Sequence, residues 1–467
     1  MNPQLRTLLA GWVSGLLPLA GLAASAEMHA DPFVKTPGAA VPLGAHVANS
    51  HMTVVLEIYS LDQNDAVAIL ETAQASQERY RIVRKFEAEN RARLSVFTAI
   101  SSNPGEHVET RSVDEIRWPS GFQPALRRTS TPLPTETLQR KAGDVFDLNL
   151  GGIADRSCRL DVYATHTTLL GFRDIAGMPD DPPVSLPGFS VQKLSTSLSC
   201  NAGQLYFVGT ISPATGRGVV NEGRAELQLA FVRACLVPVQ AVVNEGTKPA
   251  ASPANDAGPL QIEYSWYSLD RKMARDLLGP ESKPAAWWDE LQALRKQGKA
   301  RVEHLVSIRT ASGQRAHSEA TQEVDIPTAF KPPTLNGDAS GPEITLAPSQ
   351  RNSSMNTPGV PANFEPQSVG LSVEVEPVEN EEHTTADLDF AIRNNVDIGN
   401  IETTGAARRG PQLPVFEVRE FRSAMHVAND RHYFIGTLNS PSVDGVNGRT
   451  DNGKAILGFV QVTRSKD

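Results

Sequence analysis

The strongest constraint on this chain is that its sequence is duplicated at a nearly constant spacing. Tyr59–Asp62 recurs unchanged as Tyr267–Asp270, a spacing of 208 residues (267 − 59 = 208) that holds for the following strands and turns. Further along, Tyr206–Thr210 matches Tyr433–Thr437 at a spacing of 227 (433 − 206 = 227), as insertions in loops would produce. The chain therefore contains two diverged copies of one module, and its fold and function must accommodate both.

The length of 467 residues agrees with this duplication, because it exceeds what a single hydrophobic core usually serves. We expect a signal peptide at 1–26, an N-terminal linker at 27–51, a first copy at 52–236, a linker rich in Pro, Ala and Gly at 237–259, and a second copy at 260–467.

The first residues have the pattern of a secretory signal. Arg6 precedes an apolar stretch at 8–24 that Pro18 interrupts, and Ala24-Ser25-Ala26 forms an A-x-A cleavage site. No later segment has the roughly 18 consecutive apolar residues of a membrane-spanning helix. We therefore expect an exported protein, located in the periplasm or associated with the outer membrane.

Charge and cysteine content narrow the partners and the chemistry. The net charge is −9 and the basic residues are scattered, which argues against nucleic acid as a partner. In an oxidising compartment Cys158 and Cys200 could form a disulfide between two strands of the first copy. The second copy has no corresponding cysteines, and buried free thiols are the alternative.

Periodicity predicts the same order of elements in both copies. Alternating strands at 54–61 and 260–269 are followed by Asp62 and Asp270, which occupy helix N-cap positions. Two short helices should follow each cap, the second at about 77–90 in copy one and 285–297 in copy two, with apolar stripes at Tyr80, Val83, Phe86 and at Trp288, Leu291, Leu294. The fold class predicted is α+β and mostly β, with antiparallel sheets and two short helices near the start of each copy.

The later part of each copy is predicted to be strands interrupted by one long loop. Pro119 and Pro327 should force the chain out of the sheet, and loops rich in Pro, Ser and Thr should follow at 123–142 and 331–362. The remaining strands are expected after Gly152 or Gly370, and then at 189–198, 206–211 and 225–232 in copy one and at 371–377, 386–392, 416–427, 433–438 and 455–462 in copy two.

Two clusters allow a functional and a structural interpretation. Trp287-Trp288 could stack on a sugar, although their place at the head of an amphipathic helix favours packing. The run Glu379–His383 could bind a metal, although a hairpin tip of this composition is typical of a solvated turn. We expect no metal and no cofactor.

No catalytic motif occurs in the expected mature chain. Patterns for nucleophilic hydrolases, zinc proteases, P-loops and dinucleotide binding are absent. His166 and His383 lie on or beside predicted strands, with no matching acid, base or nucleophile recognisable from the sequence. The interpretation is a protein that is not an enzyme, with an unrecognised site in one copy as an open alternative.

The motifs of the second copy resemble one known family. The resemblance rests on Ser307–Ala316, Glu323–Thr328, Val369–Pro377, Asp430–Gly436 and Leu457–Thr463, which are similar in order and spacing to the C-terminal homology domain of secretins. Secretins are ring-forming channel subunits of bacterial type II and III secretion and type IV pilus systems. The sequence departs from that family where Gly436-Thr437 replaces a glycine pair and where 439–453 is polar, so the resemblance implies the fold more strongly than a channel.

The resulting functional hypothesis is an exported, non-enzymatic, secretin-like protein. It would be an accessory or structural binding component of the cell envelope or of a type II/III secretion-type system. Its partners would be envelope proteins or other copies of itself, bound through sheet edges. The alternative is a divergent secretin subunit that forms an oligomeric outer-membrane pore.

Overall fold

The computed structural model describes residues 50–123, 133–154, 157–175, 184–212, 226–239, 258–331, 360–402, 412–439 and 453–464. The expected signal peptide and almost all of both expected linkers lie outside these residues. The elements of copy one are β1 Ser50–Asp62, α1 Gln63–Thr72, α2 Ser76–Ala88, β2 Ala92–Ser102, β3 His107–Gln123, β4 Leu133–Ala154, β5 Ser157–Ile175, β6 Val184–Asn201, β7 Leu205–Ile211 and β8 Glu226–Pro238. Those of copy two are β9 Leu260–Asp270, α3 Arg271–Leu277, the 3-10 turn η1 Pro284–Ala286, α4 Trp287–Lys296, β10 Ala300–Thr310, β11 Ala316–Lys331, β12 Val360–Glu379, β13 Thr385–Glu402, β14 Gln412–Ala428, β15 His432–Asn439 and β16 Lys454–Arg464.

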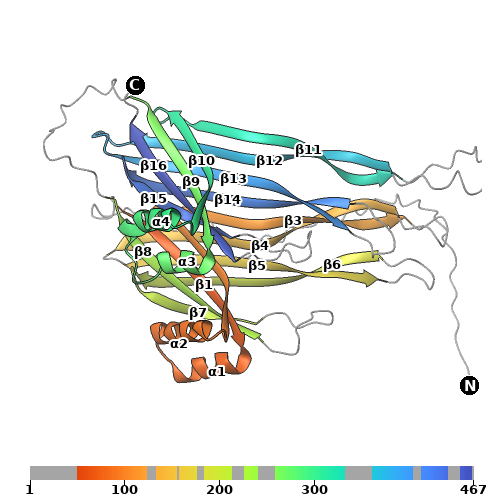
Figure 1. Cartoon of the computed structure of the whole chain (residues 1–467), viewed down its shortest axis with the longest axis horizontal. Coiled ribbons are helices and arrows are strands. Elements are labelled where there is room, and N and C mark those ends of the chain that lie inside the picture. Colours follow the sequence, from red (N-terminus) through yellow and green to blue (C-terminus); the bar gives the residue numbers. More distant parts are fainter. Residues whose placement is uncertain are drawn as a thin grey trace, which may run out of the picture. The chain divides into compact units, whose positions relative to one another are not determined.

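The strands form two eight-stranded antiparallel sheets (Figure 1). Sheet A has the order β10-β9-β16-β15-β2-β1-β8-β7, and sheet B has the order β11-β12-β13-β14-β3-β4-β5-β6. The predicted α+β, mostly β class with antiparallel sheets is confirmed.

Both copies contribute the same four strands to each sheet. In sheet A the set β1, β2, β7 and β8 corresponds to β9, β10, β15 and β16, and in sheet B β3–β6 corresponds to β11–β14. The half-sheets meet where β15 is bonded to β2 and where β14 is bonded to β3. The described residues consequently form one compact unit in which hydrogen-bonded sheets cross from one copy to the other.

The core is arranged in three layers. The helices cover one face of sheet A, and sheet B covers the other face (Figure 1). Strand β1 shows the consequence: Val55 and Tyr59 face the helices, whereas Val54 and Leu56 face sheet B, and all four are buried. A strand covered on both faces needs apolar residues at consecutive positions, which β1 supplies.

The helices begin and pack as the sequence predicts. Asp62 accepts a hydrogen bond from the Asn64 backbone N–H at 2.9 Å, and Asp270 accepts one from Lys272 at 2.9 Å, so both act as N-caps. Trp287 is buried and Trp288 stacks on His432 with ring centroids 3.5 Å apart. The two tryptophans are therefore part of the helix–sheet packing.

The prediction that the chain leaves the sheet at Pro119 is wrong. β3 continues past Pro119 to Gln123 and pairs there with β4, with irregular register on either side of Gly121. This is possible because β14 bonds to β3 only over Glu109–Glu115, so no neighbour needs an N–H from Pro119 on that side. On the edge strand β11 the chain likewise continues through Pro327.

The predicted long loops are also too long at their ends. β4 begins at Leu133, so the second half of the expected loop 123–142 is strand, and β12 begins at Val360. The rest of both expected loops, 124–132 and 332–359, lies outside the described residues.

Candidate functional site: open edges of the two sheets

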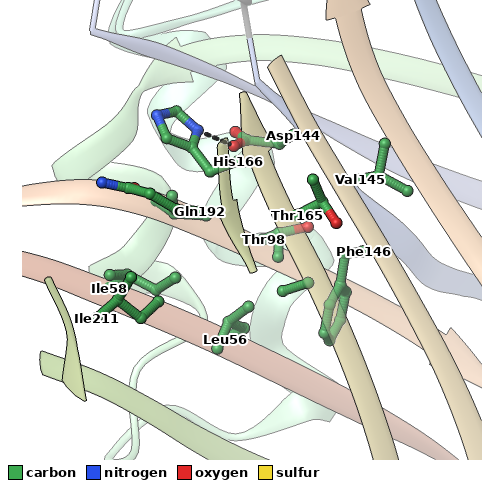
Figure 2. A pocket seen from close by; sticks show the side chains of 12 residues that line it. Leu56, Ile58, Thr98, Asp144, Val145, Phe146, Thr165, His166, Gln192 and Ile211 are labelled. Atoms are coloured by element: carbon green, nitrogen blue, oxygen red, sulfur yellow. Dashed lines mark hydrogen bonds and ion pairs between the residues drawn. The ribbon is translucent and has the colours of Figure 1, made fainter. Parts of the chain in front are cut away.

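A small cavity lies between the two sheets in copy one (Figure 2). Leu56, Ile58 and Thr98 line it from sheet A, and Phe146 and His166 line it from sheet B. The enclosed space suits about one water molecule. It is too small for an organic substrate.

His166 at this cavity has the partners that the sequence did not reveal. Its Nδ1 lies 2.6 Å from Asp144 Oδ1, and its Nε2 lies 3.1 Å from Thr168 Oγ1 (Figure 2 shows the Asp144 contact). Burial lowers the pKa of His166, but the charge and hydrogen bond of Asp144 outweigh burial, so the pKa is raised above its ordinary value. The register of β4 against β5 puts Asp144 opposite His166, and the sequence alone does not give that register.

A hydroxyl, an imidazole and a carboxylate that are hydrogen-bonded in this order can activate the hydroxyl as a nucleophile. Three observations favour a structural role: the adjacent space is water-sized, Asn439 donates a hydrogen bond of 2.8 Å to the other Asp144 oxygen, and copy two lacks these groups. Leu371 corresponds to Asp144, and Asn394 is opposite Leu371 as His166 is opposite Asp144, so the corresponding residues are Leu371, Asn394 and Val396.

The acidic hairpin of copy two is only partly the solvated turn that was predicted. The Glu379 side chain is 2% exposed and accepts hydrogen bonds from Arg464 at 2.9 Å and Asn429 at 3.1 Å, with His383 at 3.1 Å. Burial raises the pKa of Glu379, but Arg464 and the other donors outweigh it and lower that pKa. Across the described residues, no group of three or more His, Cys, Asp or Glu side chains is placed to hold a metal.

The cysteines singled out by the sequence lie directly opposite each other. Cys158 on β5 pairs with Cys200 on β6, and their sulfurs are 2.9 Å apart as buried thiols. The hydrogen bond with Cys200 lowers the pKa of the Cys158 thiol, so Cys158 is the first of the two to ionise. Their oxidation to a disulfide remains a prediction.

The most extensive set of polar contacts lies where the two copies meet. We call this region the joint, and it consists of the β14–β3 pairing in sheet B, the β15–β2 pairing in sheet A and the contacts between α2 and α3. In sheet B, Phe416–Arg422 of β14 pairs antiparallel with Glu109–Glu115 of β3. Arg111 lies opposite Glu420, and one of its terminal nitrogens is 3.6 Å from the Glu420 carboxylate. The joint is therefore a strand ladder reinforced by opposite charges.

In sheet A the joint is a close contact between β15 and β2. Gly436 lies opposite Ile100, and the Thr437 hydroxyl accepts a hydrogen bond of 2.8 Å from the Ala99 backbone N–H. A Cβ on Gly436 would lie 2.5 Å from the Phe421 ring and 3.0 Å from the Ala99 carbonyl oxygen. The approach of the two strands thus depends on glycine.

The helix layer also crosses the joint. Glu87 on α2 of copy one forms a buried ion pair with Arg275 on α3 of copy two, and Arg84 on α2 lies 3.0 Å from Asp276 on α3. Nearby, the buried carboxyl of Glu57 accepts hydrogen bonds from tyrosine hydroxyls, and burial raises its pKa. Breaking the joint would leave Glu87 or Arg275 without its buried counter-charge, which is costly.

Both sheets end in strands that have one bonded neighbour among the described strands. These open edges are β10 and β7 in sheet A and β11 and β6 in sheet B. On β11 the open part precedes Thr328, whose carbonyl oxygen accepts a hydrogen bond of 3.2 Å from the Thr137 hydroxyl of β4. Leu305 on β10 is 67% exposed, whereas its counterpart Phe97 on β2 is 0% exposed inside the joint. Each open edge is therefore the counterpart of a strand that is buried at the joint, and exposed edges of this kind are templates for strand pairing.

No family model and no curated protein matches this chain. Within the described residues, no helix combines the length and the apolar character needed to cross a membrane.

Proposed function

We propose that this chain is an exported, non-enzymatic, secretin-like component of the cell envelope or of a type II/III secretion-type system, and that it binds protein partners through its sheet edges. The observation that carries the proposal is the contrast between β2 and β3, which are paired at the joint, and their counterparts β10 and β11, which are open. An open edge offers backbone N–H and C=O groups that a partner strand can satisfy.

The secretin-like part of the proposal is supported by where the quoted motifs lie. Ser307–Ala316 covers the end of β10, the turn around Gly313 and the start of β11, while Val369–Pro377 lies in β12 and Leu457–Thr463 in β16. These segments are strands of a single arrangement that occurs twice in the chain. Export to the periplasm or outer membrane is supported by the signal-like residues 1–26.

A pore-forming secretin subunit is the second candidate. It is favoured by the fact that both sheets can be extended at both ends by further copies of the same module. The first candidate is preferred because the polar segment 439–453 stands where secretins have an apolar one.

Partner capture tests the proposal at the β10 edge. Leu305→Lys places a charge on an exposed apolar position of that edge, and Val396→Lys places the same charge on β13, an interior strand of sheet B that is paired with β14 at this position. We expect the wild-type chain and Val396→Lys to retain the same proteins from an envelope extract, and Leu305→Lys to lose most of them. Equal capture by all three would argue against edge pairing.

A further inference from the structure

We infer that the partner of these open edges is a second copy of the same chain, added head to tail through a joint that repeats the internal one. The inference rests on the proposed edge-pairing function and specifies its partner. Inside the chain, β15 and β14 of copy two meet β2 and β3 of copy one. The strands left open are their counterparts, β7 and β6 of copy one and β10 and β11 of copy two.

Each side of the molecule offers its two edges together. β6 contacts β7, and β10 contacts β11, just as β14 contacts β15 and β2 contacts β3 at the internal joint. In both sheets copy two lies on the same side of copy one, so one chain can extend both sheets of the next chain simultaneously. A single-sheet contact would leave the second pair of edges open.

The internal joint fixes the register of the inferred one. Subtracting 227 from the β14 residues and adding 208 to the β3 residues of the internal pairing sets Phe189–Ser195 of one chain opposite His317–Glu323 of the next. In sheet A the counterpart of the Gly436–Ile100 pair is Gly209 opposite Ile308. Gly209 occupies the position of Gly436 at the spacing of 227, so the glycine at the close approach is present at the open edge as well.

The charged residues at the centre of the inferred joint have opposite signs, and each sign is the reverse of the one at the corresponding position of the internal joint. Internally Glu420 of β14 faces Arg111 of β3, and the corresponding residues of the inferred joint are Lys193 of β6 and Glu319 of β11. Lys193 is exposed, and the Glu319 side chain is 43% exposed with His317 3.8 Å away. The inferred joint therefore has the same attraction as the internal one with its signs exchanged.

The reversal discriminates against wrong joints. Pairing β6 with β3 would place Lys193 against Arg111, and pairing β14 with β11 would place Glu420 against Glu319. Charge repulsion therefore disfavours pairing between two first copies or between two second copies. Such repulsion against wrong partners is a common source of specificity. The sequence thus favours an alternating order of copies along an assembly.

Apolar side chains at the edges of sheet A fit the same arrangement. Phe97 and Phe434 belong to one buried cluster at the internal joint, and their counterparts are Leu305 on the open β10 and Phe207 on the open β7. Leu305 is 67% exposed, and Phe207 is only partly buried. A head-to-tail contact of this kind propagates, and it ends in a ring or a filament depending on the rotation per chain.

Two charge-reversal variants test the joint. Lys193→Glu alone would place glutamates on both inferred edges, and Glu319→Lys alone would place lysines on both. We expect wild type to assemble in light scattering, each variant alone to have the mass of one chain, and an equimolar mixture of the variants to assemble again. Thermal unfolding of each variant checks that it folds, and recovery in the mixture requires that both do.

A cysteine pair tests the register independently. Val191→Cys with Thr321→Cys places the two thiols opposite each other across the inferred joint, as Val418 is opposite Val113 inside the chain. Oxidation should give a ladder of reducible multimers, whereas Val191→Cys with Glu323→Cys, which is two residues out of register, should give little.

The outcomes separate this inference from the proposed function. A wild-type chain of single-chain mass, charge variants that assemble like wild type, or a mixture that fails to assemble would each overturn the head-to-tail joint. If envelope proteins are then still captured in a way that Leu305→Lys abolishes, the edge-pairing function stands with a different partner.

Discussion

At the residue scale, His51 makes the stability of the contact between the two copies depend on pH. It is 1% exposed, its Nδ1 lies 3.2 Å from the His426 carbonyl oxygen, and its ring packs edge-on against Tyr433, so its environment comes from copy two. Burial lowers the pKa of His51 to about 4, below the ordinary value of 6.5, and the carbonyl contact only partly opposes this. The folded joint therefore holds a neutral imidazole.

The sign of the pH effect follows from proton binding. Between pH 6.5 and about 4 the unfolded chain binds a proton at His51 and the folded chain does not, so stability falls as the pH falls. The full effect is about 3 kcal/mol. We expect His51→Asn to unfold more easily at pH 7 but to lose less stability between pH 7 and pH 4 than wild type in denaturant titrations. A parallel loss in both proteins would show that His51 does not titrate in this way.

Cys158 and Cys200 give a second prediction at this scale. In an oxidising environment we expect them to be joined, because they face each other on neighbouring strands, and Cys235 to remain a thiol. Intact mass after alkylation under denaturing conditions should show one blocked thiol before reduction and three after it. Closing this loop should stabilise the fold by about 2–4 kcal/mol. Three alkylated cysteines without reduction would contradict the pairing.

At the element scale, two glycines allow neighbouring strands of sheet B to lie close together. Gly143 on β4 has a φ of 132°, and a Cβ there would lie 2.2 Å from the Ser112 carbonyl oxygen of β3. Gly370 on β12 has a φ of 138°, and a Cβ there would lie 2.1 Å from the Ala320 carbonyl oxygen of β11. These positions correspond at the spacing of 227, so the true counterpart of Gly370 is Gly143, and the match to Gly152 made from the sequence is wrong.

The neighbours of these glycines predict unequal costs of substitution. β3 is bonded on both sides and cannot move, whereas β11 is an edge strand that can shift away. We expect Gly143→Ala to reduce the free energy of unfolding by about 3 kcal/mol and Gly370→Ala by less. Gly152→Ala, where a Cβ would meet nothing within 4 Å, is the control. Equal losses at 143 and 370 would mean that β11 is as firmly held as β3.

Most helices and strands could be predicted from local sequence patterns. Such patterns do not show which strands pair with each other or in what register. The caps at Asp62 and Asp270 and the packing of Trp287 follow from adjacent residues, so they could be predicted. The Asp144–His166 contact and the continuation past Pro119 depend on the register and the length of a neighbouring strand. The open edges could not be predicted for the same reason. The duplication predicts two modules, but it does not show which strands of one module pair with strands of the other.

At the scale of the whole molecule, the copies share both sheets and the helix layer. Phe421 of β14 is buried in the core of copy two, where its ring contacts the positions of Gly436 and Gly458 and packs edge-on against Trp266 with the ring centroids 6.0 Å apart. The strand that carries it is bonded to β3 of copy one. Neither copy can therefore unfold without exposing apolar surface and unpaired backbone of the other.

A single unfolding transition should result. Trp118 on β3 reports on copy one and Trp266 on β9 reports on copy two, so variants that keep one of these tryptophans and carry phenylalanine at the others give separate signals. We expect both signals to change at the same denaturant concentration. Phe421→Ala should lower both midpoints together, with a loss of about 3–5 kcal/mol from the cavity it leaves. Two separated transitions, or a shift of the Trp266 signal alone, would show that the copies unfold as independent domains, and a joint that weak would be a poor template for joining one chain to the next.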